Sequence, residues 1–265
     1  MERIDGKQIA QGIYENLRAL PRPARFLAII DTSDSPASRA FIAAKERAGA
    51  DLGVEVRKFA VEPETDLIVA RVAELSREPS CGGIVVQLPL PDGVDRSQVL
   101  TAIVSGKDVD AVGADAGRTL APAVRAALAV IASCTGLTGP ELDGWLSGKI
   151  LAIVGARGFL VGAPASAYFS SKVLEVMEIE KGDDIEMLSR ADIIISGAGV
   201  PDLITPAILK DGALVIDFGY GMKNGKPAGD FNPSGEGNFS YTPVPGGTGP
   251  ILVAALFENF YKLNA

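Results

Sequence analysis

The sequence predicts an α/β protein whose strands form parallel sheets, and two observations lead to this class. Short apolar, β-branched runs alternate with helical patterns along most of the 265 residues, as in chains built from βαβ units. The predicted strands are apolar at nearly every position, which is typical of strands covered on both faces. The length fits two small domains or one large one, and the 30 glycines favour a loop-rich layout.

The elements follow from the period of their apolar residues. Strands are predicted at 26–30, 54–59, 83–87, 150–155, 173–179, 193–196 and 214–218. Helices are predicted at 5–20, 37–52, 64–77, 121–133, 163–171 and 251–263, and several of them open at a proline or a capping residue. The segment 133–148 is rich in glycine, threonine and serine and is predicted to be a connection.

Composition excludes several kinds of site and partner. The formal net charge of -8 repels phosphate backbones and anionic membranes, so we expect no nucleic-acid partner. The chain has no histidine, which leaves Lys, Asp, Glu, Tyr and backbone amides as catalytic groups. Cys81 and Cys134 are too few for a zinc site or a disulfide scaffold, and we assign no metal site. The charged start and the lack of a membrane-length apolar stretch predict a cytoplasmic protein.

A strand, a glycine turn and a helix start follow one another at 150–162. The turn contains Gly155, Gly158 and Gly162, at a spacing that differs from the usual G-x-G-x-x-G. Two interpretations are open: a dinucleotide site, where backbone approaches a pyrophosphate at a helix N-terminus, or an ordinary βα turn. Glu180 ends the next strand, near where a Rossmann carboxylate binds the ribose hydroxyls, and favours NAD unless it is merely a solvated turn residue. Arg157 favours NADP instead, because its guanidinium could accept a 2′-phosphate.

A second group of chemically capable residues lies in the first half of the chain. Ser38, Phe41 and Lys45 share one face of a predicted helix, although an isolated helical lysine is usually a solvated residue. Gln87 ends a strand directly before Leu-Pro-Leu-Pro, so its amide projects from the carboxyl end of that strand, where open α/β sheets bind ligands. Asp108 and Asp110 place two carboxylates in a loop, where either one could also be a turn former.

These residues carry a resemblance to a known family. The run QLPLP at 87–91, KDVD at 107–110 and TPVPGGTGP at 242–250 resemble the bifunctional methylenetetrahydrofolate dehydrogenase/cyclohydrolase (FolD) family. Their order and spacing match along nearly the whole chain, with further matches at VGAP (161–164), ADIIISGAGVP (191–201) and GALVIDFGY (212–220).

The resemblance implies a folate domain at 1–120 with the last helix, 248–265, returning to it, and a Rossmann-type NAD(P) domain at 121–247. It implies oxidation of 5,10-methylenetetrahydrofolate by NADP or NAD, hydrolysis of the methenyl product to 10-formyltetrahydrofolate, and a homodimer through the Rossmann domains. Lys45, Gln87 and Asp110 match catalytic positions. The implied folate contacts are Phe41, Leu88, Pro89, Gly246, Gly247 and Pro250. The implied cofactor contacts are Gly155, Arg157, Gly158, Val161, Gly162, Glu180 and Gly199.

The chemistry of the implied reaction suits a lysine. Hydride loss leaves a cationic methenyl bridge, so a charged ammonium beside it is disfavoured and the pKa of Lys45 should fall. A neutral Lys45 can then help to deprotonate the attacking water, held by the amide of Gln87.

The chain also departs from the family pattern. Phe41 replaces a tyrosine, Ala111 replaces a glycine, Leu252 replaces a threonine, and the 111–122 segment has lost several family residues. Two alternatives therefore stay open: an enzyme of this fold with only one of the two activities, or a non-catalytic dinucleotide-binding module.

Overall fold

A computed structural model describes residues 1–33, 35–113 and 116–265 of the chain. The chain forms two compact units, one from Met1–Ala10 and Ala123–Leu252 and the other from Gln11–Pro122 and Val253–Ala265. The predicted boundaries at 120 and 247 differ from these mainly at the N-terminus. There β1 (Glu2–Arg3) pairs with β11 (Phe239–Tyr241) and draws the first ten residues into the unit that contains the later strands.

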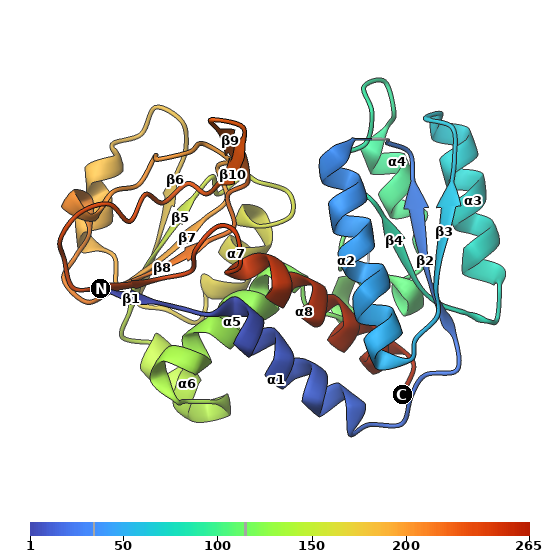
Figure 1. The fold of residues 1–265 in the computed structure, drawn as a ribbon, viewed down its shortest axis with the longest axis horizontal. Coiled ribbons are helices and arrows are strands. Elements are labelled where there is room, and N and C mark those ends of the chain that lie inside the picture. Colours follow the sequence, from blue (N-terminus) through green and yellow to red (C-terminus); the bar gives the residue numbers. More distant parts are fainter. Residues whose placement is uncertain (34, 114–115) are drawn as a thin grey trace. The chain divides into compact units, whose positions relative to one another are not determined.

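The unit formed by residues 11–122 and 253–265 contains a parallel sheet of three strands in the order β3-β2-β4. The strands are β2 (Phe26–Asp31), β3 (Val56–Ala60) and β4 (Cys81–Val86). Its helices are α2 (Pro36–Leu52), α3 (Thr65–Arg77) and α4 (Arg96–Thr101), together with most of α1 (Gly6–Arg18) and of α8 (Thr248–Leu263). In Figure 1, α2 lies on one side of this sheet and α3 on the other, as right-handed βαβ connections require.

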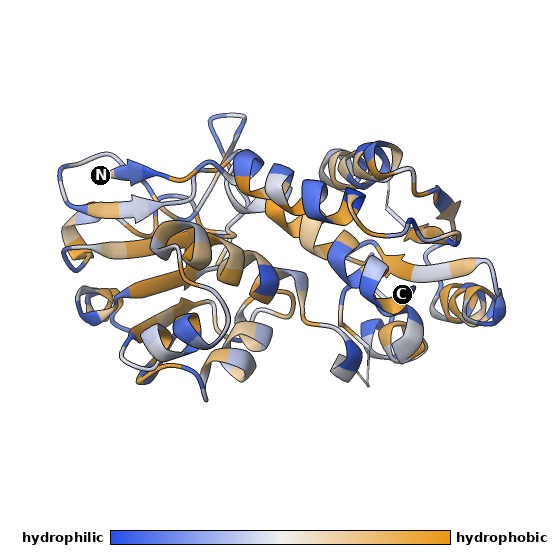
Figure 2. Ribbon diagram, turned by 90° about the horizontal axis from the view of Figure 1, so that it is seen from below, coloured by the Kyte–Doolittle hydropathy of each residue, from blue (hydrophilic) through white to orange (hydrophobic). Residues whose placement is uncertain are grey.

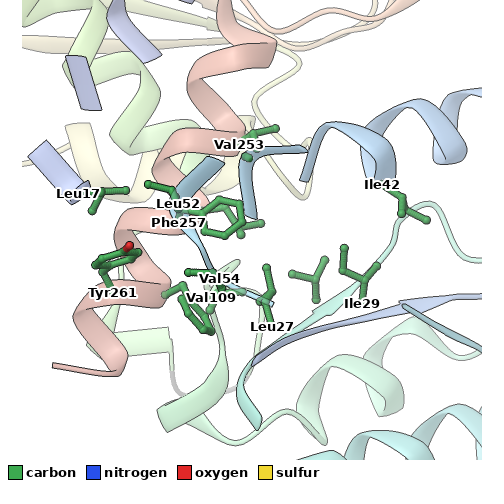
Figure 3. Packing of buried hydrophobic residues seen from close by; sticks show 14 residues of the cluster. Leu17, Leu27, Ile29, Ile42, Leu52, Val54, Val109, Val253, Phe257 and Tyr261 are labelled. Atoms are coloured by element: carbon green, nitrogen blue, oxygen red, sulfur yellow. The ribbon is translucent and has the colours of Figure 1, made fainter. Parts of the chain in front are cut away.

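Residues of α8 lie at the centre of this unit's core. Phe257 and Phe260 are fully buried and pack with Leu27 and Ile29 of β2. Figure 3 shows Phe257 and Tyr261 of α8 among side chains from the sheet and from α2. The last helix of the chain is therefore part of the core formed by residues 11–122.

The other unit contains a six-stranded parallel sheet in the order β1-β11-β8-β7-β5-β6. Its central strands β5 (Ile150–Val154), β7 (Ile193–Ser196) and β8 (Ala213–Asp217) are largely buried and mostly apolar, and apolar residues are orange in Figure 2. The edge strand β6 (Glu175–Ile179) is only partly buried. The helices are α5 (Pro122–Thr135), α6 (Gly139–Leu146) and α7 (Gly162–Phe169), and a hairpin of β9 (Gly221–Lys223) and β10 (Lys226–Ala228) follows β8. Four short 3-10 helices complete the described chain at Ser105–Lys107, Ala116–Arg118, Ile185–Arg190 and Pro206–Ile208.

The prediction of an α/β fold with parallel sheets is confirmed, and its main error lies at 133–148. This segment was expected to be a connection, but it contains the end of α5 and the whole of α6. Pro140 stands in the first turn of α6, Glu141 is an acidic first-turn residue, and Leu142 and Leu146 are buried at i and i+4. These start signals and the buried pair outweigh the two glycines within α6, Gly139 and Gly144.

Among the described helices, none is long and apolar enough to cross a membrane by itself. The bent pair of α5 and α6 reaches the length and composition of a span only when the two helices are counted together.

Candidate functional site

Lys45 and Gln87 form a direct hydrogen bond. Lys45 lies on α2, and its Nζ donates to Gln87 Oε1 at 2.8 Å. Gln87 follows β4, continues its ladder by donating its backbone N–H to Ile30 at 2.9 Å, and is buried. Its Nε2 donates to the carbonyl of Leu88 at 2.8 Å, which leaves the amide oxygen directed at the amine. The sheet edge therefore fixes the acceptor, and the acceptor orients Lys45.

Burial changes the ionisation of this lysine and of the nearby Asp110. The pKa of Lys45 is lowered, chiefly because burial disfavours the ammonium form, and Asp110 opposes that shift. Burial raises the pKa of Asp110 to about 6, and the positive charge of Lys45 counters part of that rise. The two pKa values are therefore moved toward neutrality from opposite sides, which is the condition for acid–base chemistry near pH 7.

The two carboxylates of the 105–113 loop have different structural roles. Asp108 is almost fully buried, and its carboxylate accepts from the backbone N–H of Gly113 at 2.7 Å and of Val112 at 3.2 Å. The hydroxyl of Thr119 donates to the carbonyl of Asp108 at 3.0 Å. Asp108 therefore shapes the loop, while Asp110 is the carboxylate electrostatically coupled to Lys45. Residues 114 and 115 of the divergent 111–122 segment lie outside the described ranges.

Asn259 of α8 holds this loop and is not among the residues predicted from the sequence. Its Nδ2 donates to the carbonyls of Val109 at 2.8 Å and of Leu120 at 2.7 Å, and the residue is completely buried. The signal was present as an asparagine inside an apolar helix, since a buried amide needs hydrogen-bond partners. Asn259 therefore connects the core helix to the loop that carries Asp110.

Two buried hydroxyls near the carboxyl edge of the small sheet have no hydrogen-bond partner among the residues that the structure describes. They belong to Thr32, directly after β2, and to Ser38, two turns before Lys45 on α2. Phe41 lies on the same face of α2 and is 36% exposed. Unpaired buried polar atoms are rare in proteins and are expected where a ligand supplies the partner. Ser38, Phe41 and Lys45 thus present a hydroxyl, a ring and an amine along one helix face.

The Leu88–Pro89 peptide bond directly after Gln87 is cis. Leu88 is half-buried and Pro89 is exposed, so both predicted folate contacts lie beside the fixed amide of Gln87. The structure thus brings the predicted residues Phe41, Lys45, Gln87, Leu88, Pro89 and Asp110 into one unit.

In the glycine turn, residues 155–162, backbone atoms approach one another so closely that side chains would not fit between them. A Cβ at Gly162 would lie 2.1 Å from the carbonyl oxygen of Gly155, and one at Gly158 would lie 2.9 Å from the same atom. Gly155 has φ of 77°, a left-handed conformation that favours glycine. The turn leads directly into α7, and Val161 is the residue before the helix. In the first turn of α7, Ala163 donates its N–H to the carbonyl of Gly158 at 2.9 Å and Ala165 donates to the carbonyl of Val161 at 3.0 Å. All three glycines are therefore required by the shape of the turn.

Glu180 lies against this turn. It directly follows β6, and its Oε1 accepts from the backbone N–H of Arg157 at 2.6 Å. Arg157 itself is exposed. The structure therefore places the carboxylate after the second strand beside the glycine turn after the first strand, as in the Rossmann arrangement.

The remaining predicted residues lie in two further loops of the same unit. Gly199, with φ of 68°, belongs to the loop after β7. Gly246 has φ of 98°, and a Cβ at Gly247 would lie 2.5 Å from the carbonyl oxygen of Pro243. Pro250 lies in the first turn of α8. The two glycines of this second loop thus have a conformational reason to be glycine.

Comparison with known proteins relates both parts of the chain to one family. Residues 4–110 match the catalytic domain of tetrahydrofolate dehydrogenase/cyclohydrolase, and residues 140–265 match the NAD(P)-binding domain of the same enzymes. A bifunctional protein FolD from Leuconostoc mesenteroides is 33% identical over 99% of this chain and 98% of its own length. Another from Nitrosospira multiformis is 35% identical over 97% of this chain and 93% of its own.

Solved structures show the same relation. The bifunctional FolD enzyme from Campylobacter jejuni has a TM-score of 0.89 at 28% identity and covers 100% of this chain and 98% of its own. The Trypanosoma brucei enzyme, solved with NADP and an inhibitor, has a TM-score of 0.86 at 25% identity and covers 98% and 96%. The motifs that suggested this family therefore lie in a chain that matches it over nearly its whole length.

Proposed function

The chain belongs to the tetrahydrofolate dehydrogenase/cyclohydrolase family, and from this premise we propose that it catalyses both reactions of that name. It oxidises 5,10-methylenetetrahydrofolate with NAD(P)⁺ to the 5,10-methenyl cation, and it hydrolyses this cation to 10-formyltetrahydrofolate. The observation that carries the proposal is the hydrogen bond between Lys45 and Gln87, with the pKa of the lysine lowered by burial.

Lys45 and Gln87 account for the hydrolytic step. The water oxygen bonds to the methenyl carbon and gives a hydroxyl group on it. The bond from that carbon to N5 then breaks as the hydroxyl proton is lost and N5 takes up a proton, and the formyl group remains on N10. One proton must leave the water as the new bond forms, and a neutral Lys45 accepts it while Gln87 Oε1 holds the amine in place. Asp110, ionised above about pH 6, accepts hydrogen bonds from the pterin ring.

The glycine turn fits a dinucleotide. Gly155, Gly158 and Gly162 leave backbone without side chains at the start of α7, where a pyrophosphate can approach N–H groups. When bound, the nicotinamide supplies the hydride acceptor for the first reaction. The protein's part is to hold the dinucleotide by this turn and by the loops that follow β6 and β7.

The test is a paired spectrophotometric assay on 5,10-methylenetetrahydrofolate that follows reduced nicotinamide and methenyl product together. We expect reduction without accumulation of methenyl product. Lys45→Met should lower hydrolysis of supplied methenyltetrahydrofolate by at least about 100-fold, while Arg47→Met, on an exposed position of the same helix, serves as the matched control. Lys45→Met with unchanged hydrolysis would refute the role of the lysine, and wild-type protein that reduces neither cofactor would refute the dehydrogenase.

We further propose NAD as the preferred cofactor. A carboxylate at the end of the second Rossmann strand pairs with the free ribose hydroxyls and repels a 2′-phosphate, and Glu180 lies within hydrogen-bond distance of the glycine turn. Glu180→Ser should lower the ratio of kcat/KM for NAD to that for NADP by about tenfold or more. Glu186→Ser, at an exposed glutamate of the same unit, is the control and should leave the ratio unchanged. A wild-type preference for NADP would contradict the proposal.

The assembly state and the compartment are also proposals. Met222 and Tyr220, in and beside the β9–β10 hairpin, are 60% and 45% exposed, which supports a homodimer formed through this unit because large exposed apolar groups mark interfaces. Light scattering should give a dimer mass for the wild type and a monomer mass for Met222→Asp. Cys81 and Cys134 are both free, which suits the reducing cytoplasm.

A further inference from the structure

Asp230 is a completely buried carboxylate that lies at the carboxyl edge of the large sheet. Its Oδ2 accepts from the hydroxyl of Ser196 at 2.5 Å and from the backbone N–H of Ala198 at 2.8 Å. Its Oδ1 accepts from the backbone N–H of Val200 at 2.7 Å. Three donors from one short segment therefore converge on one side chain that is about thirty residues later in the sequence.

The backbone around Asp230 is held independently of these bonds. Ile204 donates to the carbonyl of Asp230 at 2.9 Å, and Asn232 donates to the carbonyl of Ile204 at 2.9 Å. Next to it, the ring of Phe231 packs against Phe239 and Tyr241 with centroids 5.5 and 5.4 Å apart. The carboxylate is thus carried by a segment that has backbone hydrogen bonds and ring packing of its own.

The segment that Asp230 holds, residues 197–200, is the β7 loop, and it packs directly on the glycine turn. A Cβ at Gly155 would lie 3.2 Å from both Cα and N of Ala198, and a Cβ at Gly197 would lie 3.1 Å from Cβ of Val161. Beyond this contact the loop turns at Gly199 in the left-handed region, and Val200 is 49% exposed. The β7 loop therefore forms one continuous surface with the turn proposed to bind the pyrophosphate.

The carboxylate of Asp230 lies near a second buried carboxylate. This second group is Asp217, at the end of β8; it accepts from Gly219 at 2.7 Å and from Phe231 at 2.9 Å. Within the described ranges, no ion pair compensates either charge. Burying charges costs free energy that apolar residues would avoid. What the carboxylate of Asp230 provides is an acceptor with enough lone pairs for three donors of one loop.

We propose that Asp230 is a positioning residue for the dinucleotide: its carboxylate fixes the β7 loop, which packs on the glycine turn, in the shape that the cofactor contacts. Asp230 acts through Ala198 and Val200 and touches neither substrate nor cofactor. The inference rests on the proposed dehydrogenase function, and it separates the two activities. Hydrolysis of the methenyl cation uses no dinucleotide, so it does not depend on the shape of this loop.

The test compares Asp230→Asn with the wild type in three measurements. Asparagine keeps the size of the aspartate side chain but replaces one carboxylate oxygen by an N–H₂ group. One of the two backbone N–H groups, of Ala198 or of Val200, therefore loses its acceptor. We expect the calorimetric Kd and the KM for the preferred dinucleotide to rise about tenfold or more, with the hydrolysis rate of supplied methenyltetrahydrofolate within about twofold of wild type. Ser196→Ala keeps both backbone donors and should change the Kd by less than about threefold.

Controls separate positioning from folding. Asp211→Asn, at an exposed aspartate of the same unit, should leave all three measurements unchanged. Unchanged dinucleotide affinity in Asp230→Asn would overturn the inference. So would loss of amide protection across β5–β8 in that variant, because the carboxylate would then serve the fold. Dinucleotide binding can be measured without turnover. A wild type that binds the dinucleotide but does not reduce it would refute the proposed dehydrogenase function, and the positioning role of Asp230 would still be tested by the Kd.

Discussion

At the scale of single residues, burial sets the charge states of the proposed folate site. Lys45 is on a helix and Asp110 is in a loop, yet each influences the pKa of the other. Desolvation lowers the pKa of the amine and raises that of the carboxyl, and mutual attraction opposes both shifts. A low-pKa lysine and a carboxylate that ionises near pH 6 are therefore available together at neutral pH.

The raised pKa of Asp110 predicts how folate binding depends on pH. Above about pH 6 the carboxylate is ionised and accepts hydrogen bonds, whereas below it the group is neutral. We expect the KM for the folate substrate to rise roughly tenfold per pH unit below that value. The variant Asp110→Asn should have a higher KM than the wild type at pH 7, and this KM should not change between pH 5 and 7. A wild-type KM that is flat over this range would contradict the role of the carboxylate.

Ionisation of Asp110 favours folate binding, but the same raised pKa means that ionisation lowers the free energy of unfolding. The folded state holds the proton of Asp110 more tightly than the unfolded chain does, so its contribution is present below about pH 4 and is lost as the pH rises toward 6. Asp110→Asn removes a charge that is unfavourable to bury, so urea unfolding at pH 8 should show it to be more stable than the wild type. Equal stability of the two proteins at pH 8 would mean that Lys45 fully compensates the burial of Asp110.

Ala111 predicts a gain in stability at a place where the chain departs from its family. It follows Asp110 with φ of 55°, a left-handed conformation that strains a residue with a Cβ. Ala111→Gly should therefore raise the free energy of unfolding by about 1 kcal/mol, measured by urea titration. Ala132→Gly, within α5, is the matched control and should lower it by about 1 kcal/mol. A loss of stability at position 111 would show that the loop is not strained there.

At the scale of elements, apolar periodicity identified the central strands and the long helices, because their buried faces are continuous in the sequence. It missed β1 and β11, which are two and three residues long and pair across most of the chain. Lys45 and Gln87 were predicted instead from their places on a helix face and at a strand end and from the family resemblance, and the structure shows that they form a hydrogen bond. An asparagine within an apolar helix indicated that Asn259 needs hydrogen-bond partners, but its partner Val109 lies 150 residues away in the sequence, so only the tertiary fold shows which loop it holds.

The glycine turn gives a prediction at this scale. A Cβ at Gly162 would collide with the Gly155 carbonyl oxygen at 2.1 Å and with the Ala156 carbonyl at 2.6 Å, and both are backbone atoms that cannot move aside. Gly162→Ala should therefore abolish dinucleotide binding in calorimetry, with hydrolysis of methenyltetrahydrofolate retained. Gly148→Ala, where nothing lies within 4 Å of the added Cβ, is the matched control. Retained binding in Gly162→Ala would exclude the turn as the pyrophosphate site.

At the scale of the whole molecule, one of the two hydrophobic cores is built from two stretches that are far apart in the sequence. The unit that contains the proposed folate site, here called the folate unit, includes residues 11–122 together with residues 253–265. Phe257 and Phe260 of α8 are fully buried in that core. Neither aromatic residue is available until the whole chain has been synthesised. The folate unit is therefore continuous in space but not in sequence.

This arrangement predicts that the fragment 1–122 does not fold on its own. Removing one buried phenylalanine side chain costs about 3–5 kcal/mol, and a domain is stable by only about 5–15 kcal/mol. The loss of Phe257 and Phe260 together, with the Asn259 hydrogen bonds to the 105–113 loop, thus removes a stability comparable to the whole. Urea titration followed by circular dichroism should show no cooperative transition for the fragment.

Addition of a peptide covering residues 248–265 should restore that transition, because the peptide supplies the missing core. The same peptide with Phe257→Ala and Phe260→Ala is the matched control and should fail to restore it. Cooperative unfolding of 1–122 without any peptide would mean that the sheet β3-β2-β4 and its own helices suffice as a core. The proposed Lys45–Gln87 site would then be independent of α8, and Asn259 would affect only the position of Asp110.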